Sequence, residues 1–221
     1  QSTFGLTPSK VLLGHGKTAH IFGSISVGNG GDFFMPINDE GTAFILGDMM
    51  GHGLQALKES FAIKGFISGF LATGLAYQEM LVALNNALYK QQLCKSSLVT
   101  LMICFLENNK LYWLNAGHPA PVIISKNGEL SQLNGTGPLL GLSNDHQYTL
   151  YEAKLDNVEH IILYTDGWTD NRFTDKDEMT ELKKIIPMQS SSAEDFAHSL
   201  WKNSQVALSK EVDDASLIII N

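Results

Sequence analysis

The chain has 221 residues, of which 44% are hydrophobic and 17% charged, a composition that supports a globular protein with a sizeable core. Its net charge is −8, and Arg172 is its single arginine. This balance argues against a nucleic acid or an anionic membrane as partner, because both attract a basic face. No apolar run reaches the roughly 18 residues needed to span a bilayer, so we expect no membrane insertion.

The cysteines and the chain ends bear on compartment and organisation. Cys94 and Cys104 lie in apolar surroundings and form no CxxC pair, so the sequence does not indicate zinc. We interpret both as buried free thiols, which fits a reducing cytoplasm.

No repeat or linker divides the chain, and we expect a single domain over residues 1–221. Because it begins with Gln1 rather than Met, we expect a domain cut from a longer regulatory protein.

Hydrophobic periodicity predicts helices in pairs between blocks of strands. In chain order we expect strands at 19–27 and 42–47, helices at 54–71 and 77–92, strands at 98–106, 110–115, 120–125, 147–153 and 159–164, helices at 178–186 and 193–207, and a last strand at 216–220. The apolar positions used for the two long helices are Leu54, Leu57, Phe61, Phe66 and Phe70, then Leu81, Leu84 and Leu88. This order favours an α+β fold with two antiparallel sheets and helices outside them.

Four aspartates stand at the ends of the predicted strands or in the adjoining loops. They are Asp32 in Gly-Gly-Asp-Phe-Phe, Asp48 in Gly-Asp-Met-Met-Gly-His-Gly, Asp166 in Tyr-Thr-Asp-Gly and Asp213 in Asp-Asp-Ala-Ser. A buried, unpaired carboxylate costs several kcal/mol, so converging carboxylates indicate bound cations. Oxygen ligands suit Mg²⁺ and Mn²⁺, and two such ions can activate a water against a phosphoryl group. The bland alternative is that each aspartate caps backbone N–H groups in a glycine turn.

Two further motifs lie in order between these aspartates. They are Asn-Ala-Gly-His-Pro-Ala-Pro at 115–121 and Pro-Leu-Leu-Gly-Leu at 138–142. Together the six motifs resemble the bacterial stage II sporulation protein E branch of the PPM-type metal-dependent protein serine/threonine phosphatases. The resemblance covers the chain from about residue 20 to its end. It implies a four-layer αββα sandwich of two mainly antiparallel sheets, with a centre of two divalent cations, Mn²⁺ or Mg²⁺.

The resemblance also implies a role for individual residues. Asp48 matches the metal-bridging aspartate, and the resemblance implies that Asp48 and Asp166 catalyse through metal-activated water. The implied metal ligands are Asp32, Asp48, the Met49 backbone carbonyl, Asp166, and Asp213 with Asp214 as its alternative. Met50 replaces a serine that is usual in this branch, so a small hydroxyl is lost there. In Asp-Asp-Ala-Ser a serine replaces threonine and keeps the hydroxyl.

Three other side chains are candidates for the same chemistry. His52 and His118 each follow a glycine, and each is either an acid–base group or a structural hydrogen-bonding residue. Arg172, six residues after Asp166, is either a bidentate ligand of substrate phosphate or a solvated loop residue.

We therefore predict a hydrolase, a phosphoprotein phosphatase acting on phosphoserine or phosphothreonine. By resemblance its substrate is a regulatory protein of the anti-sigma-factor-antagonist type in a partner-switching pathway. Family members often sit behind a sensor or receiver domain, and the apolar helices at 54–92 suggest the further hypothesis of a homodimer. The alternative function is a weakly catalytic, phosphatase-like adaptor. A relic of a nucleotide cyclase signature explains Gly-Gly-Asp-Phe-Phe poorly, because Phe33 stands where that signature needs an acid.

Overall fold

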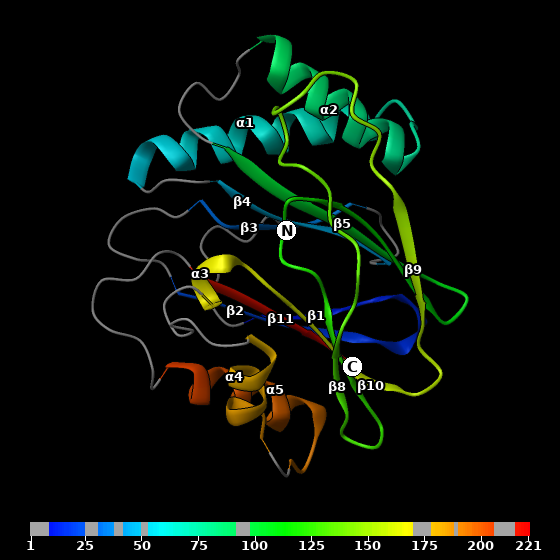
Figure 1. The fold of residues 1–221 in the computed structure, drawn as a ribbon, viewed down its shortest axis with the longest axis vertical. Helices are drawn as coiled ribbons and strands as arrows, with labels where there is room; N and C mark the ends of the chain where they lie inside the picture. The colour runs from blue at the N-terminus through cyan, green and yellow to red at the C-terminus, as the bar shows by residue number, and fades with distance from the viewer. Residues whose placement is uncertain are drawn as a thin grey trace.

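The computed structural model describes residues 9–24, 31–37, 42–49, 53–91, 98–169, 178–187, 190–205 and 215–221. Two stacked sheets lie between two layers of helices (Figure 1). The six-stranded sheet has the order β1 (Ser9–Leu12), β2 (Thr18–Ser24), β11 (Ala215–Ile220), β10 (Val158–Tyr164), β7 (Val122–Ser125) and β8 (Leu130–Gln132). The five-stranded sheet has the order β3 (Phe33–Pro36), β4 (Ala43–Met49), β5 (Val99–Glu107), β6 (Lys110–Ala116) and β9 (Leu150–Lys154).

Each sheet is covered on its outer face by one pair of helices. Helices α1 (Gly53–Leu71) and α2 (Tyr77–Gln91) cover the five-stranded sheet, and α4 (Glu178–Ile185) and α5 (Ala193–Gln205) cover the six-stranded sheet (Figure 1). A short helix, α3 (Asp166–Thr169), follows β10, and a 3-10 turn, η1 (Gly14–Gly16), joins β1 to β2. Every strand pairing in both sheets is antiparallel. The predicted α+β sandwich is confirmed.

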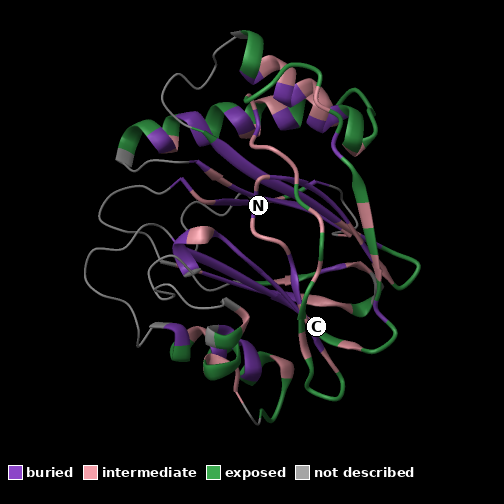
Figure 2. Cartoon of the chain, in the orientation of Figure 1, coloured by how far each residue is buried: buried purple, intermediate pink, exposed green. Residues whose placement is uncertain are grey.

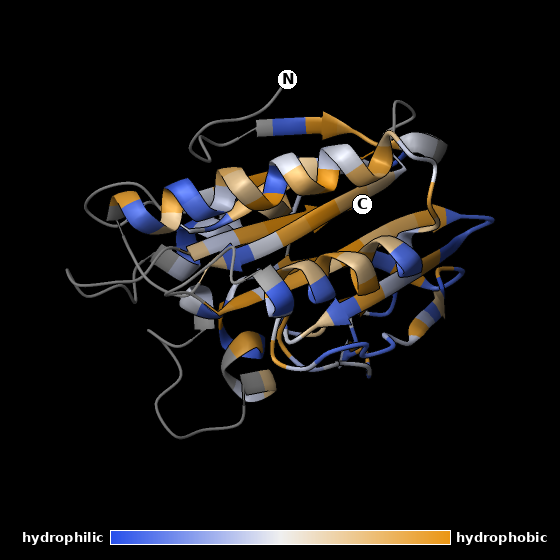
Figure 3. Ribbon diagram, turned by 90° about the horizontal axis from the view of Figure 1, so that it is seen from above, coloured by the Kyte–Doolittle hydropathy of each residue, from blue (hydrophilic) through white to orange (hydrophobic). Residues whose placement is uncertain are grey.

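The central strands, such as β4, β5 and β11, are buried on both faces, which explains their continuous apolar runs. Neighbouring side chains on a strand point to opposite faces, so Phe44 packs between the sheets while Ile45 packs under α1 and α2. In the same way Ile218 faces the other sheet and Ile219 faces α5. Figure 2 shows the buried strands between helices whose outer faces are exposed. Figure 3 shows the apolar runs along the same strands. Cys104 is one of these buried side chains and is a free thiol, whereas Cys94 lies outside the described residues.

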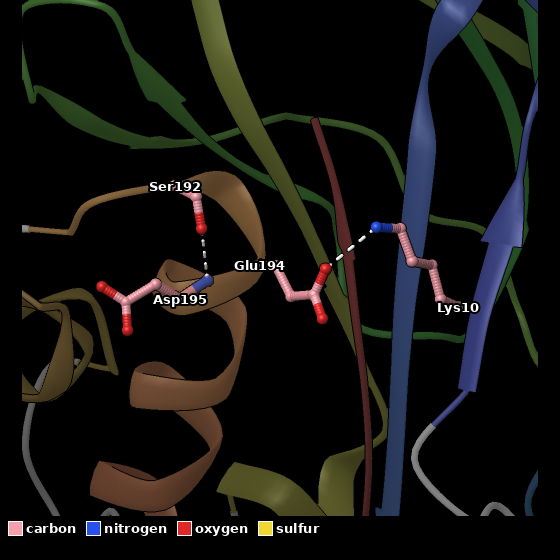
Figure 4. Close-up of polar contacts among 4 residues, drawn as sticks. All are labelled: Lys10, Ser192, Glu194 and Asp195. Atoms are coloured by element: carbon pink, nitrogen blue, oxygen red, sulfur yellow. Dashed lines mark hydrogen bonds and ion pairs between the residues drawn. The ribbon is translucent and has the colours of Figure 1, made fainter.

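The start of α5 is fixed by capping and by one ion pair. The Ser192 hydroxyl accepts a hydrogen bond from the Asp195 N–H at 3.1 Å, which satisfies a donor at the helix N-terminus. Glu194 pairs with Lys10 of β1 at 2.9 Å (Figure 4), an exposed contact between the helix and the edge strand of its sheet.

Most predicted elements are confirmed, with differences at short strands and on one helix face. The sequence did not indicate β1, β3, β8 or α3, which are only three or four residues long. Leu81, Leu84 and Leu88 of α2 are buried as expected. The stripe expected for α1 was wrong in part, because Leu54 and Phe61 are exposed, whereas Phe66 and Phe70 are half-buried against the core. That helix buries instead a narrower face: Ala56, Glu59, Ser60, Ile63 and Ile67. No described helix is both long and apolar enough to cross a membrane.

Candidate metal centre

Three of the four predicted aspartates, Asp32, Asp48 and Asp166, meet at one end of the two sheets, which we call the acidic edge. Asp48 is the second-last residue of β4, and Asp32 directly precedes β3, the neighbouring strand. Asp166 comes from the other sheet, where it opens α3 just after β10. The Asp48 carboxyl interacts with both Asp32 and Asp166, so the three carboxyls gather around it. Strand ends of different sheets thus bring together side chains that are up to 134 positions apart in the chain (Asp32 and Asp166).

The electrostatics of this cluster favour a cation. Burial, and then the negative charges of Asp32 and Asp166, raise the pKa of Asp48 to about 10. Without a cation, Asp48 therefore keeps a proton at neutral pH and shares it in hydrogen bonds with its neighbours. A divalent cation relieves the same repulsion and lets all three carboxyls ionise. The donor set, which is entirely oxygen, fits Mg²⁺ or Mn²⁺.

Asp32 is held by two hydroxyl groups from the opposite sheet. Thr165 donates from Oγ1 to Asp32 Oδ2 at 2.8 Å, and Ser216 donates from Oγ to the same oxygen at 2.6 Å. The Thr165 hydroxyl in turn accepts the Ser216 N–H at 2.9 Å. Thr165 and Ser216 are buried, so this small network orients the carboxyl in surroundings of low dielectric.

The Met49 carbonyl lies against a glycine. A Cβ added at Gly31 would stand 2.4 Å from the Met49 oxygen, so only glycine allows the chain beside Asp32 to pass this close. Two predicted donors, the Asp32 carboxyl and the Met49 carbonyl, are therefore kept near each other by a packing contact that no larger residue permits.

The motif at 115–121 forms a closed turn at the same end of the five-stranded sheet. Asn115 Oδ1 accepts the His118 N–H at 2.8 Å, and Asn115 Nδ2 donates to the His118 carbonyl at 2.9 Å. Gly117 has a φ of +72°, and a Cβ there would lie 2.4 Å from the Leu139 side chain. Asn115 and Gly117 thus hold His118 in one position.

The remaining predicted site residues cannot be placed from the structure. Asp213, Asp214, His52 and Arg172 lie outside the described residues. Within the described ranges, no three histidine, cysteine or acidic side chains are grouped as a metal site on their own. The predicted ligand set does not consist of described side chains alone. It also includes the Met49 backbone carbonyl and either Asp213 or Asp214, which lie outside the described residues.

Sequence reasoning missed the hydroxyl groups that support the aspartates. Thr165 directly precedes Asp166 but is not among the site residues predicted from the sequence. The serine of Asp-Asp-Ala-Ser was noted only as a retained hydroxyl, and the structure shows that this residue, Ser216, binds Asp32. Thr100 was also missed. Its one sequence signal is that it is a polar residue inside an otherwise apolar strand.

The arrangement of two antiparallel sheets between helix pairs is the fold of PP2C phosphatase domains. The PP2C phosphatase domain of SpoIIE from Bacillus subtilis superposes with a TM-score of 0.75 at 16% identity, covering 97% of this chain and 64% of that structure. RsbX in complex with magnesium superposes with a TM-score of 0.68 at 14% identity, covering 97% and 98%. The model of the Stage II sporulation protein E (SpoIIE) family matches residues 38–221, and the chain belongs to this family.

A curated relative is longer than this chain. Phosphoserine phosphatase RsbU of Bacillus subtilis (strain 168) is 24% identical over 199 residues, which cover 86% of this chain. The matched part is 58% of RsbU, so the chain spans little more than half the length of this relative.

Proposed function

We propose that the chain is a metal-dependent protein phosphatase that hydrolyses phosphoserine or phosphothreonine on a regulatory protein. The observation that carries the proposal is the convergence of Asp32, Asp48 and Asp166 from two sheets at one edge. The family and the name of RsbU, a phosphoserine phosphatase, support the same reaction. A phosphorylated protein of the anti-sigma-factor-antagonist type is the proposed substrate, and control by a sensor or receiver domain is proposed with it.

Two divalent cations, Mn²⁺ or Mg²⁺, would be held by oxygen donors of this edge. The donors would be Asp48, which the resemblance assigns as the shared ligand, together with Asp32, the Met49 carbonyl, Asp166 and Asp213 or Asp214. When bound, such ions polarise a water and neutralise the charge that develops on the phosphoryl group. RsbX, which shares the fold, was crystallised in complex with magnesium.

The chain's own residues have four tasks in this reaction. Asp48 would have to lose its proton before it could hold a cation, so cation binding and deprotonation would be linked. Thr165 and Ser216 fix the orientation of Asp32. His52 is proposed as an acid–base group, and Arg172 as a bidentate contact to substrate phosphate.

The test is phosphate release from phosphorylated candidate partners, with and without Mn²⁺. Asp48→Asn and Asp166→Asn should each lower the Mn²⁺-dependent rate by more than about 100-fold. The matched control is Asp156→Asn, which changes an exposed aspartate that is hydrogen-bonded to Asn109. Full activity in either site variant would contradict the proposal. Failure of the wild type to bind Mn²⁺ or Mg²⁺ at millimolar concentration would favour a non-catalytic adaptor.

A further inference from the structure

A buried histidine stands beside the acidic edge without belonging to its donor set. The side chain of His118 is 2% exposed, and its Nδ1 lies 2.8 Å from Thr100 Oγ1. Burial lowers the pKa of His118 to about 3, so the ring is neutral at physiological pH. A neutral, enclosed ring is badly suited to exchange protons with a substrate. It is well suited to hold two groups at a fixed distance.

The two groups that His118 contacts belong to different sheets. Thr100 is in β5 and stands directly opposite Asp48 in the antiparallel ladder of β4 and β5. The ring also interacts with the Tyr164 backbone, two residues before Asp166. This second contact is weaker than a full hydrogen bond, because Nε2 has no hydrogen-bond partner among the described residues. The Thr100 contact is therefore the stronger of the two.

The tautomer follows from the two neighbours. The contact with the Tyr164 backbone raises the pKa of the ring, as an accepting carbonyl does, and Nδ1 faces Thr100, so we assign the ring proton to Nε2. Nδ1 then accepts the hydroxyl proton of Thr100. The neutral imidazole thus offers one donor to the six-stranded sheet and one acceptor to the five-stranded sheet. An apolar side chain of similar size offers neither.

We propose that His118 is a positioning residue, a cross-sheet bridge that sets the spacing between Asp48 and Asp166 and thereby the affinity for divalent cations. This inference rests on the proposed metal-dependent function. Asn115 and Gly117 keep the bridge in place, which gives the Asn-Ala-Gly-His motif a function at the metal edge. Hydrogen bonds that orient metal ligands typically change metal affinity by 10–100-fold when they are removed.

The experiment measures Mn²⁺ binding by calorimetry without any substrate. His118→Leu should weaken binding by about 10-fold or more, whereas His118→Gln, which keeps a donor and an acceptor, should recover part of the loss. The matched control is His160→Leu. His160 is also buried, but it bonds to Asn221 at the opposite end of β10. His160→Leu should lower thermal stability and leave Mn²⁺ affinity at the wild-type value.

Hydrogen exchange gives a second readout that needs no metal. Peptides covering 98–101 and 164–168 should exchange faster in His118→Leu and not in His160→Leu. Should His118→Leu fail to fold, Thr100→Val removes the same bridge from the other side and carries both measurements. Wild-type affinity together with unchanged exchange in a folded His118→Leu or Thr100→Val overturns the inference.

The two proposals fail in different ways. A wild type that binds Mn²⁺ but releases no phosphate contradicts the proposed function and leaves the bridge to be judged by affinity. A wild type that binds no Mn²⁺ contradicts both the proposed function and the effect on affinity. Hydrogen exchange then decides whether the bridge orders the two strands.

Discussion

The two ends of the sandwich differ in the burial of their polar side chains and in the sheets that these side chains connect. At the acidic edge, Ser216 and Thr165 reach Asp32 across the sheets, in buried surroundings. At the far end, polar pairs such as Lys110 with Glu152 are solvent-exposed and join neighbouring strands of one sheet. Buried polar groups cost free energy unless each one is satisfied, whereas exposed pairs cost and contribute little. The acidic edge is therefore where the fold gives up stability for a site.

The acidic edge should make the metal-free protein sensitive to alkaline pH. The Asp48 pKa of about 10 in the folded chain lies above the value of 3.8 expected when unfolded, so the folded state binds more protons between these values. Unfolding free energy should then fall as pH rises through this window, by a few kcal/mol in all. Asp48→Asn should flatten the dependence and raise the melting temperature of the metal-free protein at pH 8. Thermal denaturation in EDTA from pH 5 to 9 measures this.

Proton release on Mn²⁺ binding gives a second test of the repelling carboxyl cluster. Cation binding should release protons, which calorimetry detects as a heat that varies with the ionisation enthalpy of the buffer. Asp156→Asn, at the far end, should behave as the wild type in both measurements. Unfolding of the metal-free protein that is independent of pH would contradict a repelling carboxyl cluster.

Gly31→Ala should damage the acidic edge through packing alone. The new Cβ would stand 2.4 Å from the Met49 carbonyl and 3.0 Å from the Met49 Cβ, so the backbone must shift. We expect a loss of about 1–3 kcal/mol in urea unfolding, together with weaker Mn²⁺ binding. Gly65→Ala is the control on α1, where a Cβ meets nothing within 4 Å. It should stabilise the protein by up to about 1 kcal/mol and leave Mn²⁺ binding unchanged.

Removal of the hydroxyl groups that bond Asp32, those of Thr165 and Ser216, should have a somewhat smaller effect. Thr165→Val removes a donor to Asp32 and leaves the Ser216 N–H without its acceptor, so we expect a loss of about 1–3 kcal/mol. Ser216→Ala removes one donor and should cost less. Both should weaken Mn²⁺ binding by about 10-fold in calorimetry. Equal affinity in Ser216→Ala and the wild type would show that Thr165 alone orients the carboxyl.

The sequence predicted the layers and the aspartates but not the supports between them. Long apolar runs such as β4 and β11 are visible locally, and the glycine-flanked aspartates carry motifs. The contacts of Thr165 and Thr100 depend instead on how two sheets stack, which no local pattern encodes. The exposed face of α1 was mistaken because α1 carries apolar residues such as Leu54 and Phe61 outside its buried face as well. Short strands such as β3 were missed because pairing with a longer neighbour, not their own sequence, holds them.

The far end should tolerate the loss of its ion pair. Lys110 and Glu152 meet at 2.8 Å with solvent-exposed side chains on adjacent strands, so water and salt screen the attraction. Glu152→Gln should leave the melting temperature and the Mn²⁺ affinity within measurement error, at low and at high salt. Thermal denaturation at two ionic strengths, with Ser216→Ala measured alongside, makes the comparison direct. If Glu152→Gln lowered the melting temperature as much as Ser216→Ala, the polar contacts at the two ends would contribute equally to stability. The difference between the two ends proposed here would then be wrong.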